Sequence, residues 1–253
     1  CPSNISRFIP SLPGYVYAVK DDKVYVNLFL SNRAKLKVNG KNVVLEQETS
    51  YPWNGDIRLT VAKGNQPFVM NVRIPGWVRG SVLPGGLYSY ADGEELAYRV
   101  SVNGQEVKGA LQKGYLSIDR RWKKGDVVEI HFDMQPRVVK ANDKVAADRG
   151  RVAIECGPLV YCAEWPDNDF DISTLLLNRH PKFQVVEHPD LLGGINEITT
   201  RAQALSYDAT GRLAAKDVKL TLIPYYAWAH RGEGRMEVWL PIEVGAASAE
   251  LQE

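Results

Sequence analysis

Apolar and polar residues alternate along most of this chain, with the two-residue period of a β-strand that buries one face. In residues 57–61 and 68–74 every second residue is apolar. Turn-forming residues separate such segments at short intervals, and no stretch before residue 140 shows a long helical period. The pattern therefore predicts an all-β protein with little helix. Further strand patterns fall at 24–30, 128–134, 152–161, 183–186, 218–223 and 236–242, whereas 199–205 fits a strand or a helix.

Two Asn-Gly dipeptides, Asn39-Gly40 and Asn103-Gly104, each lie between apolar strand segments. The tightest hairpin turns need a positive φ angle at both central residues, and Asn and Gly adopt that conformation readily. We therefore expect a β-hairpin at each dipeptide. The sequences around the two dipeptides resemble each other, but one similarity of this kind indicates two hairpins rather than a repeat array.

Short strands at regular spacing are typical of β-sandwiches, so we expect two antiparallel β-sandwich domains of the jelly-roll-like type. Pro136 ends the first block of strands, and residues 137–149 form a polar connector. The expected domains are therefore residues 15–136 and residues 137–253. The last strand belongs either to the second sandwich or, as in many Greek-key folds, to the first.

The N-terminal stretch, residues 1–14, has a different pattern. Its apolar residues follow a near-helical spacing from Ile5 to Leu12, between prolines. The chain begins at Cys1, without an initiator methionine. We interpret the stretch as the tail of a packed element and the chain as a fragment of a longer protein.

Charge and composition exclude several classes of protein. The 253 residues include 31 Lys plus Arg and 30 Asp plus Glu, so the formal net charge is +1. This balance, without a basic block, argues against a nucleic-acid partner. No apolar run approaches the roughly 20 residues of a membrane helix. Three cysteines are too few for a disulfide scaffold in a chain of this length.

Catalytic and metal-binding motifs are sparse. The four histidines lack the spacing of known zinc motifs, and no phosphate-binding glycine loop follows a strand. Cys156 and Cys162 flank a Gly-Pro pair, and two buried thiols are favoured over a metal pair. Glu155, Glu164 and Asp167 could be paired for glycoside hydrolysis, but carboxylates are too common for such a pairing to carry weight.

The densest aromatic patch is residues 224–232, PYYAWAHRG. Aromatic faces at the edge of a sandwich stack on sugar rings, so Trp228 is a candidate carbohydrate contact. Arg231 could bind sugar hydroxyls or a carboxylate. A buried aromatic corner or a domain interface is the favoured alternative, because aromatic residues dominate packing as well.

Residues 1–7, CPSNISR, resemble the second half of a motif of bacterial β-L-arabinofuranosidases of glycoside hydrolase family 127. That motif reads Cys-Cys-Pro-(Ser/Pro)-Asn-x-x-Arg. Six similar segments in the same order make the resemblance specific over nearly the whole chain. The others are 12–17 (LPGYVY), 73–77 (RIPGW), 114–126 (GYLSIDRRWKKGD), 150–161 (GRVAIECGPLVY) and 224–229 (PYYAWA).

In that family an N-terminal (α/α)6 barrel carries catalysis, and β-sandwich domains follow it. The resemblance therefore implies that this chain is the C-terminal sandwich region, with residues 1–14 as the tail of the barrel. The nucleophilic cysteine of the motif would precede Cys1. Cys1 itself matches a zinc ligand of the family, whose other ligands lie in the barrel. One cysteine cannot hold zinc, so we expect no cofactor in this chain and zinc in the intact parent.

The resemblance implies the accessory region of a bacterial retaining glycoside hydrolase acting on β-L-arabinofuranosides, and the chain alone is expected to be inactive. The alternatives are a free-standing carbohydrate-binding module that uses Trp228 and Arg231, and a purely structural module. The expected partners are the barrel, contacted by Phe8, Ile9 and Leu12, and arabinose-containing plant glycans. We expect neither nucleic-acid binding nor a membrane span. The cysteines suit the bacterial cytoplasm and the periplasm equally, so the compartment stays open.

Overall fold

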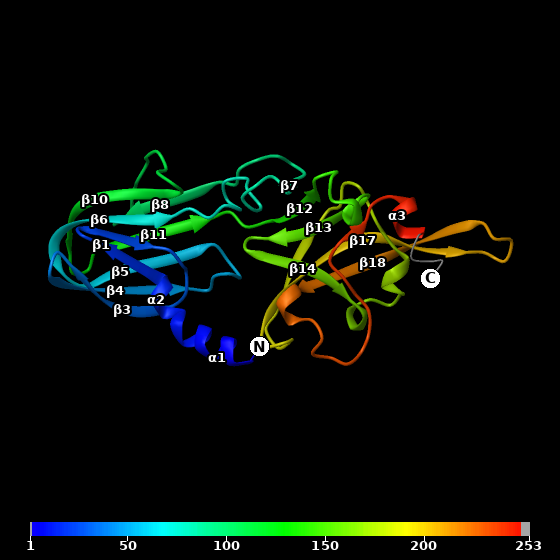
Figure 1. The fold of residues 1–253 in the computed structure, drawn as a ribbon, viewed down its shortest axis with the longest axis horizontal. Coiled ribbons are helices and arrows are strands. Elements are labelled where there is room, and N and C mark those ends of the chain that lie inside the picture. The colour runs from blue at the N-terminus through cyan, green and yellow to red at the C-terminus, as the bar shows by residue number, and fades with distance from the viewer. Residues whose placement is uncertain (1, 249–253) are drawn as a thin grey trace. The chain divides into compact units, whose positions relative to one another are not determined.

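The computed structural model describes residues 2–248 (Figure 1). Half of the chain lies in strands and 12% in helices, which confirms the predicted all-β class with little helix. By internal contacts the chain divides into two compact units. Unit 1 comprises the residues up to Arg79 together with Glu95–Asp133, and unit 2 comprises Gly80–Glu94 together with the residues from Met134 on. The chain therefore enters unit 2 at residue 80, returns to unit 1 at residue 95 and enters unit 2 again at residue 134, instead of crossing once between residues 136 and 137.

Unit 1 contains a four-stranded sheet in the order β1-β2-β6-β10. Its neighbouring strands are antiparallel except for β2 and β6, which run parallel. Met70 and Trp122 are fully buried on one face of this sheet. The strands are β1 (Tyr17–Lys20), β2 (Lys23–Val26), β6 (Asn65–Arg73) and β10 (Tyr115–Lys123).

The second sheet of unit 1 has six antiparallel strands in the order β3-β4-β5-β11-β8-β9. Both predicted hairpins are confirmed. Asn39 and Gly40 connect β3 to β4 with φ angles of 48° and 73°, and Asn103 and Gly104 connect β8 to β9 with 51° and 80°. The strands are β3 (Asn32–Val38), β4 (Lys41–Thr49), β5 (Asp56–Lys63), β8 (Tyr98–Val102), β9 (Gln105–Glu106) and β11 (Val127–Phe132).

Alternating apolar residues of both sheets form the buried core of unit 1, as the two-residue period requires. Phe68 and Trp122 stack with ring centroids 5.5 Å apart, and the indole Nε1 of Trp122 donates a hydrogen bond to the Phe68 carbonyl. Gln66 connects the two sheets, because its Nε2 donates to the carbonyl of Val38 at 3.1 Å. This arrangement is sandwich-like, while the jelly-roll type stays a prediction.

The N-terminal stretch forms α1 (Pro2–Ser11) and α2 (Pro13–Val16). No residue of α1 is buried. Ile5, Phe8, Ile9 and Leu12 nevertheless follow the i, i+3, i+4, i+7 spacing of a helix face, so α1 and the turn after it present an apolar face to solvent.

Unit 2 contains a sheet with the strand order β15-β17-β18-β14-β13-β12-β7, and β16, β19 and β20 pair with its members. The last strand, β20, pairs with β13 of unit 2. The strands are β7 (Tyr88–Tyr90), β12 (Pro136–Ala141), β13 (Arg151–Cys156), β14 (Leu159–Glu164), β15 (Leu175–Leu177), β16 (Gln184–His188), β17 (Ile195–Tyr207), β18 (Leu213–Pro224), β19 (Met236–Glu237) and β20 (Leu240–Pro241).

The predicted polar connector at 137–149 begins as strand β12. Arg137 and Val139 are buried on one face of this strand, so a cation occupies a position where sequence patterning expects an apolar residue. The Arg137 guanidinium donates to both carboxylate oxygens of Asp92 and lies 3.5 Å over the ring of Tyr90. Residues 80–94 are thereby fixed to unit 2, and Tyr90 pairs with Val139 at the edge of the sheet.

Strand β17 determines the architecture of unit 2, and it settles the ambiguous segment 199–205 as strand. On one side it pairs with β18 over ten consecutive residue pairs. On the other side it pairs first with β16 and then with β15. Ile198 and Ala202 of β17 belong to the apolar core of the unit, together with Leu220 and Leu222 of β18.

Short helical turns connect the strands of unit 2: η1 (Ala146–Asp148), η2 (Trp165–Asp167), η3 (Ile172–Thr174), η4 (Tyr225–Ala227) and α3 (Val244–Ser248). Within residues 2–248, none of the helices has the length and apolar character that crossing a membrane requires.

Candidate functional site

The candidate site from the sequence, Trp228 and Arg231, lies in unit 2 beside two neighbouring strands. Strand β14 continues into η2, and β18 continues into η4. The strands are antiparallel neighbours, with Tyr161 opposite Pro224. The loop that follows η4 returns to η2, where the Trp165 amide donates to the carbonyl of Arg235 at 3.1 Å. Two segments about 60 residues apart in sequence are therefore adjacent in the fold.

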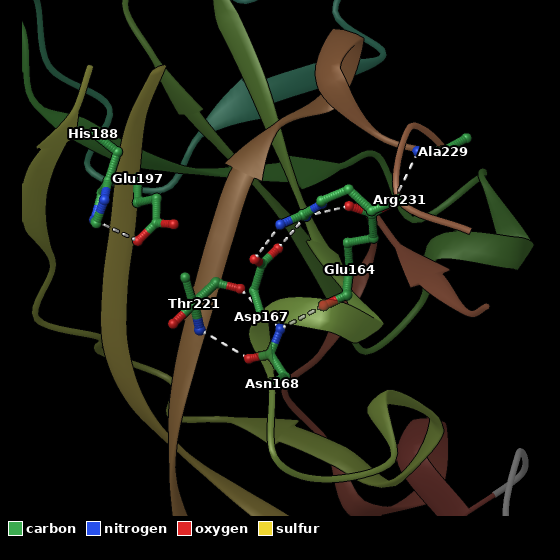
Figure 2. Close-up of polar contacts among 8 residues, drawn as sticks. All are labelled: Glu164, Asp167, Asn168, His188, Glu197, Thr221, Ala229 and Arg231. Carbon is green, nitrogen blue, oxygen red and sulfur yellow. Dashed lines mark hydrogen bonds and ion pairs between the residues drawn. The ribbon is translucent and has the colours of Figure 1, made fainter. Parts of the chain in front are cut away.

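Arg231 is the centre of a cluster of charges (Figure 2). Its Nη1 lies 2.6 Å from Oδ1 of Asp167, and its Nη2 lies 2.6 Å from Oδ2 of the same carboxylate. Nη2 also donates to Oε2 of Glu164. Both carboxylates are at least nine-tenths buried. Their charges raise the pKa of the Arg231 guanidinium, with Asp167 the larger cause, so the arginine is charged throughout the range in which proteins fold.

Glu164 also holds the backbone of the loop. Its Oε1 accepts a hydrogen bond from the amide of Ala229 at 2.8 Å. Ala229 has a φ angle of 66°, a left-handed conformation that costs a non-glycine residue about 1 kcal/mol or more. The hydrogen bond and the ion pairs of Arg231 stabilise this conformation.

Asn168 fixes the other side of the cluster. Its Oδ1 accepts from the amide of Thr221 at 2.9 Å, and its Nδ2 donates to the carbonyls of Thr221 and Glu164. Figure 2 shows this link between η2 and β18 next to the Arg231 ion pairs. Because every hydrogen-bonding atom of the buried Asn168 amide group has a partner, the end of β14 is tied firmly to β18.

Aromatic side chains are exposed on the loop that this cluster holds. Tyr225 and Trp228 stack with ring centroids 6.3 Å apart and an interplanar angle of 27°. They are 45% and 36% exposed, and Tyr226 is 56% exposed. The ring of Trp165 packs closely over Gly234, where a Cβ atom would lie 1.9 Å from its Cδ1. The aromatic patch is therefore partly exposed on a loop that hydrogen bonds and ring packing hold in place.

His188 of β16 and Glu197 of β17 lie in contact, with Nε2 3.0 Å from Oε2, and the contact is an ion pair when His188 is protonated (Figure 2). Burial raises the pKa of the Glu197 carboxyl, and the charge of Asp167 adds to this effect. His188, Lys219 and Arg231 oppose it. The charges around Arg231 thus extend across the sheet to β17.

The other candidates from the sequence, Cys156, Cys162 and Glu155, lie on strands β13 and β14 and not on this loop. Cys156 and Cys162 are buried on the adjacent strands β13 and β14, and the Gly-Pro pair between them forms the hairpin turn. Burial raises the pKa of Cys156 to about 11 and that of Cys162 to about 12, so both are inert thiols at neutral pH. Glu155 accepts a hydrogen bond from the Tyr90 hydroxyl at 2.7 Å, so its hydrogen-bond partner is not a member of the Arg231 cluster.

Zinc does not fit the described part of the chain. Among residues 2–248, no group of three or more His, Cys, Asp and Glu side chains is arranged to hold a metal ion. The sequence candidate for a zinc ligand, Cys1, lies outside the described residues.

Sequence reasoning considered Glu164 and Asp167 as a catalytic pair and did not connect them to Arg231. Arg231 lies 64 residues after Asp167 and 67 residues after Glu164, and no local spacing signals these contacts. The basic surface of β17 and β18 described below was also missed, because Arg201 and Lys219 come together only through strand pairing.

Residues 2–248 thus form an all-β fold of two units, with aromatic residues exposed on a loop that ion pairs hold in place. Comparison with known families is specific. Residues 23–134 match the model "Beta-L-arabinofuranosidase, GH127 middle domain", and residues 136–241 match the "Glycoside hydrolase family 127 C-terminal domain". The chain belongs to glycoside hydrolase family 127, of which it comprises the middle and C-terminal domains.

Individual relatives agree with this assignment. The chain is 34% identical to a non-reducing end beta-L-arabinofuranosidase of Bifidobacterium longum subsp. longum, an alignment that covers 94% of this chain and 36% of that protein. A solved GH127 beta-arabinofuranosidase, BT3674, is 71% identical with a TM-score of 0.95 over 97% of this chain and 39% of its own. A GH127 beta-L-arabinofuranosidase from Geobacillus Stearothermophilus T6 is 35% identical with a TM-score of 0.84, over 95% of this chain and 37% of its own. The chain thus spans little more than a third of the length of these relatives.

Proposed function

We propose that this chain is the accessory β-sandwich region of a retaining glycoside hydrolase that acts on β-L-arabinofuranosides. Its relatives carry the name of this activity, and the chain corresponds to less than two-fifths of their length. Under this proposal the chemistry belongs to the remaining part of the longer protein, and the present chain supports that part.

The proposal rests on one observation: the carboxylates of Glu164 and Asp167 are buried and bound by Arg231. Retaining glycosidases generally need one carboxyl group or other nucleophile and one acid/base residue facing an open sugar site. Glu164 and Asp167 lie together, but Arg231 binds both, and Glu164 is 2% exposed. These carboxylates brace a loop and are not available to a substrate.

The apolar face of α1 supports a docking role. Ile5, Phe8 and Ile9 are 56–58% exposed, although large apolar residues at this spacing normally face a packed partner. We assign the helical catalytic barrel of the longer protein as that partner. Cys1, which directly precedes α1, would then lie at the barrel and serve there as a zinc ligand. Bound zinc would keep a coordinating thiol deprotonated.

An activity assay on two polypeptides tests the proposal. The 253-residue chain with excess zinc should not hydrolyse a chromogenic β-L-arabinofuranoside, whereas a protein of the relatives' full length should. Phe8→Asp in the longer protein should lower its activity and thermal stability, while the matched exposed change Tyr207→Asp, at the β17–β18 hairpin, should not. Turnover by the chain alone that Glu155→Gln or Cys156→Ser abolishes would contradict the proposal and indicate an active site in unit 2.

A free-standing carbohydrate-binding module is the second candidate function. The stacked pair Tyr225 and Trp228 favours it, since exposed aromatic rings suit the apolar face of a sugar ring. In this function Arg231 would position the loop, because its guanidinium is occupied by carboxylates. Binding of neutral arabino-oligosaccharides by the isolated chain, lost in Trp228→Ala and retained in Tyr207→Ala, would support it. Absence of such binding would exclude it.

A further inference from the structure

Unit 2 contains a groove of about 970 Å³ at the point where β17 changes its partner strand. Thr199 of β17 pairs with Gln184 of β16, and Ala202 pairs with Leu177 of β15. Thr200 and Arg201 of β17 therefore lie opposite the gap between those two strands. The connection between β15 and β16, residues 178–183, forms a wall of the groove.

The wall is fixed at both ends. Asn178 donates through Nδ2 to the Arg201 carbonyl at 3.2 Å. Arg201 has no partner residue in β15 or β16, so this side chain supplies the hydrogen bond that a neighbouring strand would otherwise make. Phe183 packs against the apolar core of unit 2 at the other end. Because strand pairing, a hydrogen bond and core packing hold its sides, the groove is preformed, as ligand sites usually are.

Positive charge gathers in this groove. Arg201 on β17 lies directly opposite Lys219 on β18, and Lys182 of the wall lines the same space. Like charges at directly opposed positions of a sheet are destabilising. Among residues 2–248, none of the three cations forms an ion pair or a side-chain hydrogen bond. Lys219 is only near enough to Glu197 to affect its pKa, and His188 already pairs with that carboxyl.

Some arginines at other cross-strand positions of this protein face glutamates. Arg33 lies opposite Glu46, and Arg58 lies opposite Glu129, each as an ion pair. In the groove the corresponding neighbour of Arg201 is a lysine. The carboxylate that lines the groove, Asp217, accepts a hydrogen bond from Gln203 at 3.3 Å. Three permanent cations against this one carboxylate leave a net charge of +2, and His180 adds to it when protonated.

We infer that this groove binds an acidic oligosaccharide, with uronate carboxylates on Arg201 and Lys219 and sugar hydroxyls toward Thr199 and Gln184. The guanidinium fork of arginine matches the two oxygens of a carboxylate, and hydroxyl and amide side chains match sugar hydroxyls. The groove is large enough for a short oligosaccharide. That the anionic ligand is a saccharide rests on the proposed function. That the groove is cationic rests only on the residues that line it.

Titration of the 253-residue chain with tetragalacturonate at low ionic strength, followed by calorimetry, tests the inference. We expect saturable binding that weakens at least about tenfold when Arg201→Gln and Lys219→Gln are combined, because charge-assisted hydrogen bonds are lost. Lys216→Gln removes a lysine from the same strand outside the groove and should leave the affinity unchanged. Circular dichroism checks that each variant is folded, and Lys182→Gln, outside any strand, gives a second test should the double variant unfold.

Two further ligands identify what the groove recognises. For a neutral arabino-oligosaccharide of equal length, the double variant should have the same affinity as the wild type. Inorganic phosphate should compete only weakly with tetragalacturonate. The inference is overturned by no saturable binding of tetragalacturonate, by equal binding in the double variant, or by a neutral sugar or phosphate binding equally well at the same residues. Hydrolysis of a neutral β-L-arabinofuranoside by the longer protein is measured separately, so failure here leaves the proposed function standing.

Discussion

Arg231 and Asp167 form a bidentate ion pair, with Nη1 and Nη2 each 2.6 Å from one carboxylate oxygen. The Asp167 side chain is 9% exposed and that of Arg231 is 21% exposed, so water screens this pair only in part. Glu164 accepts from the same guanidinium and from the amide of Ala229. The position of the exposed Trp228 therefore depends on charges beneath the surface.

Asp167→Asn should destabilise unit 2. The change leaves a guanidinium in a half-buried site with a single carboxylate, and breaking such a pair costs about 2–4 kcal/mol after allowance for the exposed part of Arg231. Urea unfolding at pH 7 measures the free energy of unfolding. Glu46→Gln, which removes the partner of the exposed Arg33, is the matched control and should cost no more than about 0.5 kcal/mol. Equal effects of the two changes would mean that the Arg231 pair is as weak as a surface pair.

In the Glu155→Gln variant, the free energy of unfolding should fall less steeply with increasing pH than in the wild type. Burial raises the pKa of the Glu155 carboxyl, while the Tyr90 hydroxyl and Arg137 oppose this effect. Between the unfolded pKa and the raised folded pKa, the folded state binds more protons, so the free energy of unfolding falls with increasing pH. Glutamine has no proton to lose but can still accept from Tyr90. Unfolding free energies of wild type and variant across pH 4 to 8 should therefore diverge, and parallel curves would refute the prediction.

Gly55→Ala should destabilise unit 1 by about 2 kcal/mol or more, as expected for overpacking against a fixed neighbour. A Cβ atom at Gly55 would lie 1.9 Å from the backbone carbonyl oxygen of Phe132, and the Phe132 amide donates to the carbonyl of Gly55 at 3.0 Å. Main-chain atoms of β11 cannot move aside as a side chain can. Gly14→Ala is the control, because no atom lies within 4 Å of its added Cβ. Thermal unfolding midpoints that fall equally in both variants would contradict the prediction.

Cys156 and Cys162 should resist thiol reagents in the native chain. Both are buried, and burial raises their pKa to about 11 and about 12, so the reactive thiolate is scarce at pH 8. In a Cys1→Ser background, a chromogenic disulfide reagent should modify native protein at least about tenfold more slowly than protein in urea. Rapid modification of one thiol in the native state would show local opening of β13 or β14.

Much of the fold could be predicted because its signals are local. Asn39-Gly40 determines its hairpin through the conformations of two adjacent residues, and these have the expected positive φ angles. Strand β12 escaped prediction because Arg137 occupies a buried position, where contacts with Asp92 and Tyr90, more than 40 residues away, stabilise it. Segment 199–205 was ambiguous until β16 and β18 were seen to pair with it.

The candidate site was less accessible to sequence reasoning. Composition marked Trp228 and Arg231, but whether an aromatic residue is exposed depends on what packs over it. The sequence offered Arg231 as a ligand for sugar hydroxyls, and the structure surrounds it with Glu164 and Asp167 instead. Such contacts arise from the pairing of β14 with β18, which no spacing along the chain encodes.

The excursion of residues 80–94 makes unit 2 a discontinuous domain. A polypeptide starting at Met134 would lack β7, so the edge of its sheet would be open, and Arg137, 4% exposed, would lose the carboxylate of Asp92. The sequence boundary between the two family models is thus not a boundary at which the chain can be cut into independently stable halves. A synthetic peptide spanning 80–94 should instead act as a complementing fragment, restoring a folded unit 2 when added in trans.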